Sequence, residues 1–169
     1  MNDAHYHLVI NHFPIMGTIF GVGILIAGLV LKRMILQQTA FVLFIISALT
    51  GFLAMYTGEG AEELVENLPG IGHTIIHEHE ELAEKFAVVL YALGLLSMAT
   101  LFLQIKKNGF AKIAVYVTLI LSLLAVVLGK AVGTSGGEVR HTEIRTTSAD
   151  TTAQQKTDQT PSSEQEEEE

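Results

Sequence analysis

Long apolar blocks separated by short polar segments dominate the first 132 residues of the chain. Four blocks are long enough to cross a membrane: residues 8–31, 39–56, 86–105 and 110–132. A membrane-spanning helix needs roughly 20 mostly apolar residues, because each residue rises about 1.5 Å through a hydrocarbon core about 30 Å thick. A surface helix of a soluble protein would keep a polar face, and these blocks have none. The pattern therefore predicts an all-α protein, an integral membrane four-helix bundle.

The polar segments divide the chain into two parts. Residues 1–133 form the predicted transmembrane domain, in which residues 57–85 are an outer loop between the second and third spans. Residues 134–169 are rich in Thr, Ser, Gln and Glu. The glycines at 133–137 are expected to end the fourth helix, and the segment beyond has too little apolar surface to offset its ordering entropy. We predict a disordered acidic C-terminal tail, in which only residues 137–144 could dock on the bundle.

Basic residues indicate how the spans are oriented. They lie in the connections after the first and third blocks, at Lys32, Arg33, Lys106, Lys107 and Lys112, whereas residues 57–85 are acidic. Because positive residues stay on the cytoplasmic side, both termini and the acidic segment should face outward. In a bacterium this predicts a multi-pass protein of the inner (cytoplasmic) membrane with both termini on the periplasmic side.

Composition and motifs restrict the function. The chain has no cysteine, which excludes disulfides, thiolate metal sites and iron–sulfur clusters. Its net charge of −8, much of it in the tail, argues against nucleic acid as a partner. The serines of the apolar blocks have no neighbouring base, so no catalytic residue is assigned and a hydrolytic enzyme is the least expected class.

Six of the seven histidines form two clusters on the predicted outer side: His5, His7 and His12, then His73, His77 and His79. A helix starting near residue 72 would place His73, His77 and Glu81 in one stripe, since residues four apart share a face. Two His and one Glu at that spacing are a partial shell for a transition metal. A solvated first helical turn is the alternative, and it accounts for the neighbouring glutamates but not for the histidines.

These patterns give two overlapping sets of candidate site residues. The cofactor-binding candidates are His12, His73 and His77; the metal-binding candidates are His7, His12, His73, His77, His79 and Glu81. His12 enters the bilayer just before Pro14, at a depth where a polar group is often functional, although an interfacial His bonding water and headgroups is an equal alternative. A haem b site would use two imidazoles from different helices, and a bare zinc, copper or iron site three or four side chains. The spacing leaves both open.

The run HLVINHFPI at residues 7–15 resembles the opening of a bacterial family of four-span membrane proteins of unknown function, marked by a His-x4-His-Phe-Pro signature. Members typically have Thr-Gly after the second span, a His near the start of the third and Gly-Gly after the fourth. The matching positions here are Thr57-Gly58, one of His73, His77 and His79, and Gly136-Gly137. The resemblance covers residues 5–137 and implies a fold and a membrane location, without an established reaction.

Two functions therefore remain open. The first is binding of haem or a transition metal at the outer membrane surface, with electron transfer to a quinone or a periplasmic carrier as the natural role of a haem. The second is a non-catalytic scaffold or accessory subunit of a larger membrane complex, respiratory or transport, that docks through its acidic tail. A transporter is less expected, because the spans have no charged residue in their middle and no broken helix. In every case the lipid bilayer is a partner.

Overall fold

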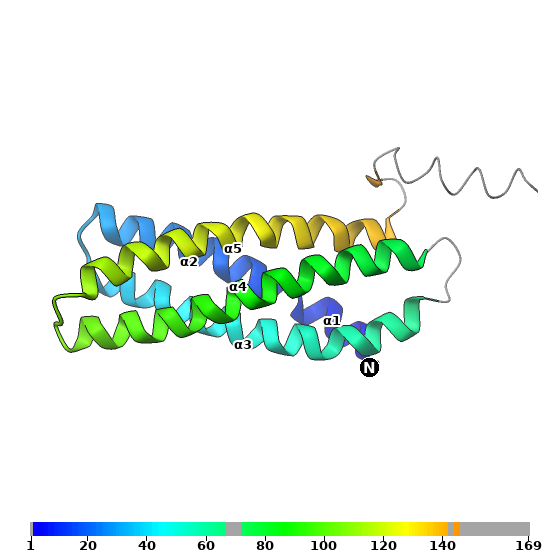
Figure 1. Cartoon of the computed structure of the whole chain (residues 1–169), viewed down its shortest axis with the longest axis horizontal. Helices are drawn as coiled ribbons and strands as arrows, with labels where there is room; N and C mark the ends of the chain where they lie inside the picture. The colour runs from blue at the N-terminus through cyan, green and yellow to red at the C-terminus, as the bar shows by residue number, and fades with distance from the viewer. Residues whose placement is uncertain (1, 67–71, 142–143, 146–169) are drawn as a thin grey trace, which may run out of the picture.

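The computed structural model describes residues 2–66, 72–141 and 144–145, and these are almost entirely helical (Figure 1). Five helices follow one another: α1 Asp3–Ile10, α2 His12–Val30, α3 Met34–Val65, α4 His73–Ile105 and α5 Ala111–Arg140. The described ranges contain no strand. With α1 and α2 taken together, four helical segments are long and apolar enough to cross a membrane. The all-α, four-span prediction is confirmed.

The four long helices run up and down as a bundle (Figure 1). Helix α2 packs on α3, α3 on α4, α4 on α5, and α5 returns to α2, while α1 lies against α3. The α2–α3 and α4–α5 turns meet at one end, the left in Figure 1. We call this the lysine end, because it carries Lys32, Lys107 and Lys112. The opposite end, with α1 and the start of α4, is the histidine end.

A break at Asn11 separates α1 from α2. Pro14 has no backbone N–H, and in a continuous helix its ring would clash with the carbonyl of Ile10, four residues earlier. The chain therefore restarts its helix with Asn11 as N-cap and His12 as the first residue of α2. Pro14 thus lies in the first turn of α2, where its missing N–H leaves no helical hydrogen bond unmade.

Small residues let α2 and α3 approach closely. A Cβ added at Gly17 would collide with the hydroxyl of Ser47, and one added at Gly21 would collide with the ring of Phe44. Phe44 is completely buried. Lipid tails are as apolar as the side chains they touch, so close van der Waals packing of this kind is what holds spans together. The Gly17–Gly21 spacing thus serves packing inside the bundle.

The exterior of the bundle is apolar along the spans. Only 22% to 39% of the most apolar part of each span is buried inside the bundle, so most of its side chains face lipid.

Three of the helices are longer than the hydrocarbon core is thick. Helices α3, α4 and α5 have 32, 33 and 30 residues, roughly 45–50 Å at about 1.5 Å per residue, against a hydrocarbon core of about 30 Å. Their polar turns lie at the histidine end, which therefore extends beyond the core.

Several helix ends lie outside the predicted spans. Most of residues 57–85 is helical, since α3 continues to Val65 and α4 begins at His73 with Gly72 as its N-cap. Helix α5 continues through residues 133–137 and ends at Arg140 instead of residue 132. Helical hydrogen bonding thus continues past the apolar blocks from which the spans were predicted.

Packing explains why the glycines at 133–137 do not end α5. The hydroxyl of Ser135 bonds to His79 of α4, and Gly136 lies against the same imidazole ring. These contacts with α4 outweigh the low helix propensity of glycine, about 1 kcal/mol per residue relative to alanine. Beyond the helix, Ile144 lies against Gly137, and Arg145 donates to the backbone carbonyls of Glu138 and Val139 near the end of α5. Residues 134–140 of the predicted disordered tail are thus part of α5, and its residues 142–143 and 146–169 lie outside the described residues.

Candidate cofactor site

A cavity of about 470 Å³ lies inside the histidine end of the bundle, with walls from all five helices. Small residues leave much of this space: Gly51 and Ala54 on α3, Ala83 and Ala87 on α4, and Gly133, Gly136 and Gly137 on α5. Larger apolar side chains complete the lining, among them Ile15, Met55, Phe86 and Leu90. The volume lies in the range of cofactor pockets, roughly 300–1,000 Å³.

A few polar groups interrupt this apolar lining. They are four histidines, His7, His12, His79 and His141, together with Asn11 and Arg140. An apolar cavity with a small number of convergent polar groups is the usual form of a ligand site. The cavity therefore gathers His7 and His12 from the first sequence cluster with His79 from the second.

The half-buried imidazole of His7 is fixed by α3. Its Nδ1 lies 3.0 Å from the carbonyl oxygen of Ala54. A carbonyl oxygen can only accept, so Nδ1 carries the proton and donates it. The hydroxyl of Thr57, 3.4 Å from the same nitrogen, lies within reach of two α3 carbonyls to which it can donate. The neutral ring consequently keeps its lone pair on Nε2.

The imidazole of His79, also half-buried, is fixed by α5 in a comparable way. Its Nδ1 lies 2.9 Å from the Oγ of Ser135, and that Oγ lies 3.1 Å from the carbonyl oxygen of Val132. A serine has one hydroxyl proton, and Ser135 uses it to donate a hydrogen bond to the Val132 carbonyl oxygen. Nδ1 of His79 is then the donor to the Ser135 oxygen, and the lone pair of the neutral ring is again on Nε2.

His12 is more exposed than His7 and His79. Its Nδ1 lies 3.0 Å from the carbonyl oxygen of Leu8, so Nδ1 again carries the proton of the neutral ring. Among the residues that the structure describes, none accepts or donates a hydrogen bond at Nε2 of His7, His12 or His79. A metal-ligating histidine usually has this arrangement, in which one nitrogen is oriented by a carbonyl or hydroxyl and the other is open.

Asn11 and Arg140 add two further polar groups to the cavity wall. The Oδ1 of Asn11 is buried and has no hydrogen-bond partner in the described part of the chain. A buried acceptor left unpaired costs about 1–3 kcal/mol, so a donor from water or a ligand in the cavity would stabilise this end. Arg140 closes α5 and supplies a cation at the cavity.

The remaining candidates lie outside the cavity. His73 and His77 are exposed, and Nε2 of His77 lies 3.5 Å from the carboxylate of Glu81, which Lys85 contacts at 2.9 Å. The predicted one-face spacing of His77 and Glu81 is therefore present, but on the solvent side of α4. No three His, Asp or Glu side chains within residues 2–66, 72–141 and 144–145 come together as a metal shell.

Sequence reasoning missed the contribution of α5 to this site. Ser135 lies among the glycines that were expected to end the helix, and Arg140 and His141 follow them. The available signal was Gly136-Gly137 itself, because paired glycines can mark a close approach between helices as well as a helix end. Continuing the helix through them would have brought Arg140 towards the histidines.

Comparison with known proteins gives a family and no ligand. A family model described as "Predicted membrane protein (DUF2231)" matches residues 5–147. No curated protein and no solved structure matches the chain significantly. The matched region includes every residue that lines the cavity.

Proposed function

This chain belongs to the DUF2231 family of predicted membrane proteins, and we propose that it binds haem b in the cavity at the histidine end and transfers single electrons. His7 and His79 would hold the haem iron through their Nε2 atoms. One observation carries the proposal: two half-buried imidazoles on different helices each hold Nδ1–H in a hydrogen bond and line a mostly apolar cavity with Nε2 open.

The number of available ligands favours haem over a bare metal ion. A six-coordinate haem takes its four equatorial nitrogens from the porphyrin and needs only two side chains from the protein, often on facing helices of a bundle. His7 stands on α1 and is held by α3, whereas His79 stands on α4 and is held by α5. A bare zinc or copper ion would need three or four protein ligands, and the described residues offer no such group.

Other residues of the cavity suit the two sides of a haem. Phe86 and Leu90 supply apolar surface for the macrocycle. Arg140 supplies a cation that would pair with a propionate, since a guanidinium binds carboxylates in a two-pronged geometry. Haem held this way would supply a ferric–ferrous couple, with a potential set by the histidine ligands and the apolar surroundings.

The position of the cavity suggests the partners. The bases of the short connections lie at the lysine end, so the positive-inside rule predicts that the histidine end faces the outer side, which would be periplasmic in a bacterial inner membrane. Because the cavity lies where the helices leave the hydrocarbon core, it is accessible both to a quinone in the bilayer and to a periplasmic electron carrier. We propose these two classes as electron donor and acceptor.

The test compares two pairs of histidines in the full-length protein purified in mild detergent. We expect wild type to retain about one haem per chain, and the His7→Ala/His79→Ala variant to retain almost none. The matched control is His73→Ala/His77→Ala, which removes the same number of histidines from the exposed side of α4 and should retain haem like wild type. Far-ultraviolet circular dichroism checks that each variant is helical.

Three results would overturn the proposal. The first is equal haem content in the cavity variant and wild type, and the second is loss of haem only in the control variant. A colourless wild-type protein that co-purifies with stoichiometric partner proteins would also overturn it, in favour of the accessory-subunit function.

A further inference from the structure

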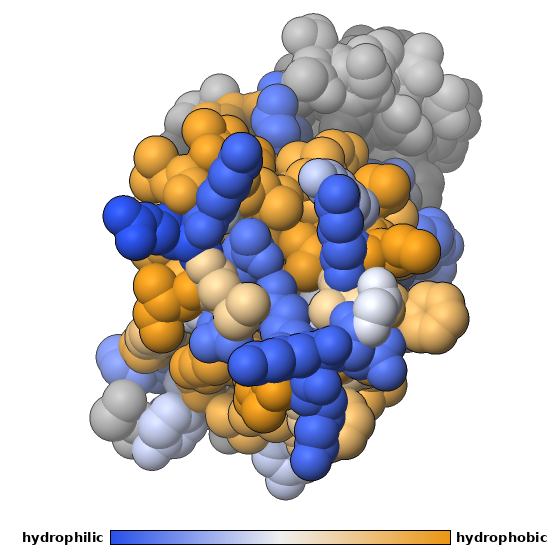
Figure 2. Space-filling model, turned by 90° about the vertical axis from the view of Figure 1, so that its left-hand side faces the viewer, coloured by the Kyte–Doolittle hydropathy of each residue, from blue (hydrophilic) through white to orange (hydrophobic). Residues whose placement is uncertain are grey.

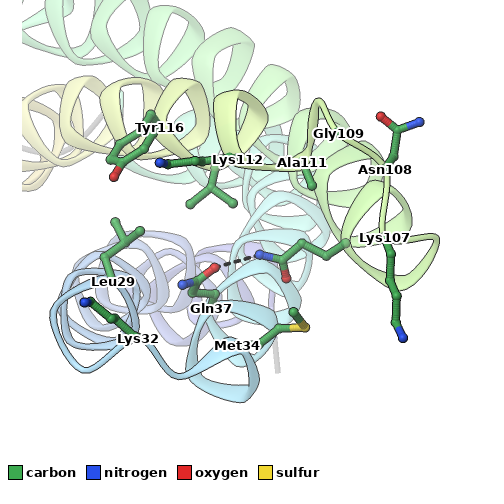
Figure 3. Close-up of a pocket in the computed structure, with 12 residues that line it drawn as sticks. Leu29, Lys32, Met34, Gln37, Lys107, Asn108, Gly109, Ala111, Lys112 and Tyr116 are labelled. Atoms are coloured by element: carbon green, nitrogen blue, oxygen red, sulfur yellow. Dashed lines mark hydrogen bonds between the residues drawn. The ribbon is translucent and has the colours of Figure 1, made fainter.

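A second cavity, of about 450 Å³, lies at the lysine end among α2, α3, α4 and α5 (Figure 3). Lys32, Lys107 and Lys112 line it together with the amides of Gln37 and Gln104. Seen from outside, this end has hydrophilic side chains across its centre and hydrophobic surface around them (Figure 2). The proposed haem site does not use these groups.

A chain of hydrogen bonds fixes the two amides and leaves one acceptor open. Nε2 of Gln37 donates to the carbonyl oxygen of Gly28 at 3.2 Å, and Nε2 of Gln104 donates to Oε1 of Gln37 at 2.7 Å (Figure 3). Reversing either amide would bring two oxygens or two NH2 groups together. Gln104 is only 7% exposed, and its Oε1 has no partner among the described residues. This buried oxygen is a site for a hydrogen-bond donor.

Lys32 and Lys107 occupy equivalent and strained backbone positions. Their φ angles are 51° and 52°, in the left-handed region. Each follows the C-cap residue of a helix, Leu31 after α2 and Lys106 after α4, and its N–H and the next N–H return to the carbonyls three and five residues earlier. This is the Schellman motif, in which glycine is strongly preferred at the left-handed position. Two lysines at these positions indicate that the side chain outweighs the backbone cost.

Orientation of the protein does not by itself require the strained lysines. Arg33 and Lys106, the residues next to them, carry the same charge at the same end with ordinary negative φ angles. They serve the positive-inside rule equally well. Lys32 differs in that its side chain lines the cavity, as that of Lys112 does from α5.

We propose that this cavity binds the headgroup of an anionic phospholipid. Lys32 and Lys112 would hold the phosphodiester, and a headgroup hydroxyl would donate to Oε1 of Gln104. In Figure 3, Lys112 extends past Tyr116 above the space and Lys32 lies below it beside Leu29, while Lys107 points away. Lysine side chains attract lipid phosphates at a membrane surface. Phosphatidylglycerol carries both the charge and the hydroxyl.

A lipid fits this position better than a free phosphate ion. The cavity lies where the apolar spans end at the two turns, which is the level of the headgroups. Its lining also includes Leu29, Met34 and Val115, which offer apolar surface to the first part of an acyl chain. A free phosphate ion would leave that surface without a partner.

The test measures lipid binding to the full chain in detergent by native mass spectrometry. We expect one molecule of phosphatidylglycerol to bind, and Lys32→Gly to weaken it about tenfold, the loss of one charge-assisted hydrogen bond. Glycine suits the left-handed position, so this variant should fold and unfold at the same or a higher temperature than wild type. Lys106→Gln is the matched control, because Lys106 adds charge at the same end but does not line the cavity; it should change affinity less than twofold.

A second comparison tests the open acceptor. Phosphatidylmethanol has the charge of phosphatidylglycerol but no hydroxyl in its headgroup, so wild type should bind it several-fold more weakly. In Gln104→Leu the two lipids should bind equally.

Three outcomes would overturn the proposal. The first is unchanged phosphatidylglycerol affinity in Lys32→Gly, and the second is an equal loss in Lys106→Gln, which would show general surface attraction. The third is complete displacement of the lipid by millimolar inorganic phosphate, which would identify a site for the free ion. Haem content plays no part in these measurements, so they stand apart from the proposed function.

Discussion

Gly94 on α4 offers the sharpest test of the packing between spans. A Cβ added there would lie 2.6 Å from the Cβ of Ala48 on α3. Carbon atoms without a bond between them prefer about 3.5–4.0 Å, so the two helices would have to separate by roughly 1 Å. Gly23 on α2 is the matched control, because a Cβ added there would meet nothing within 4 Å.

The comparison isolates the cost of overpacking. Both substitutions to alanine remove the helix penalty of a glycine, about 1 kcal/mol, and this gain cancels in the difference. Forcing an extra carbon into a tight interface costs about 1–3 kcal/mol. We therefore expect Gly94→Ala to have a free energy of unfolding about 2 kcal/mol below that of Gly23→Ala.

Unfolding in mixtures of a mild detergent and sodium dodecyl sulfate, followed by circular dichroism, measures this difference. Gly23→Ala should match wild type or exceed it. Equal free energies of unfolding for the two variants would refute the close contact between α3 and α4. A more stable Gly94→Ala would refute it more strongly, since the added methyl would then fill a gap.

Two further substitutions test other contacts. Gly136→Ala would place a Cβ 3.0 Å from Cε1 of His79 and should lower haem content, whereas Gly23→Ala, whose Cβ meets nothing within 4 Å and lies outside the cavity, should not; equal haem content in the two would contradict the proposed ligand. Thr118→Val removes the buried 3.0 Å hydrogen bond between the hydroxyls of Thr100 and Thr118, which joins α4 to α5. It should lower the free energy of unfolding by about 0.6 kcal/mol in the same assay, and an increase would contradict a stabilising role for that bond.

The spans were predictable from sequence because the bilayer imposes a length and an apolar surface on each of them. The break at Asn11 was predictable from the backbone chemistry of Pro14. The outer ends of α3 and α5 were not predictable from sequence, because the apolar pattern stops there while the helix continues. Contacts such as that of Ser135 with His79 hold these turns, and such contacts depend on a neighbouring helix.

Sequence analysis selected histidines as the candidate site residues, but it did not predict which of them come together in the fold. Sequence spacing selected His73 and His77 as a pair because residues four apart share a face, but it could not show that this face is the exposed one. His7 and His79 are 72 positions apart, and only the packing of α1 on α3 and of α4 on α5 brings both to one cavity. The tautomers that leave Nε2 open depend on partners from those other helices.

The central claim is that the cavity at the histidine end holds a haem between two histidines. The most direct test is the visible spectrum of the purified full-length protein, oxidised and then reduced with dithionite, with haem and protein quantified in the same sample. The account predicts sharp reduced Soret and α bands typical of a six-coordinate b-type haem, at about one haem per chain. A protein without these bands that also fails to bind added haemin would contradict it.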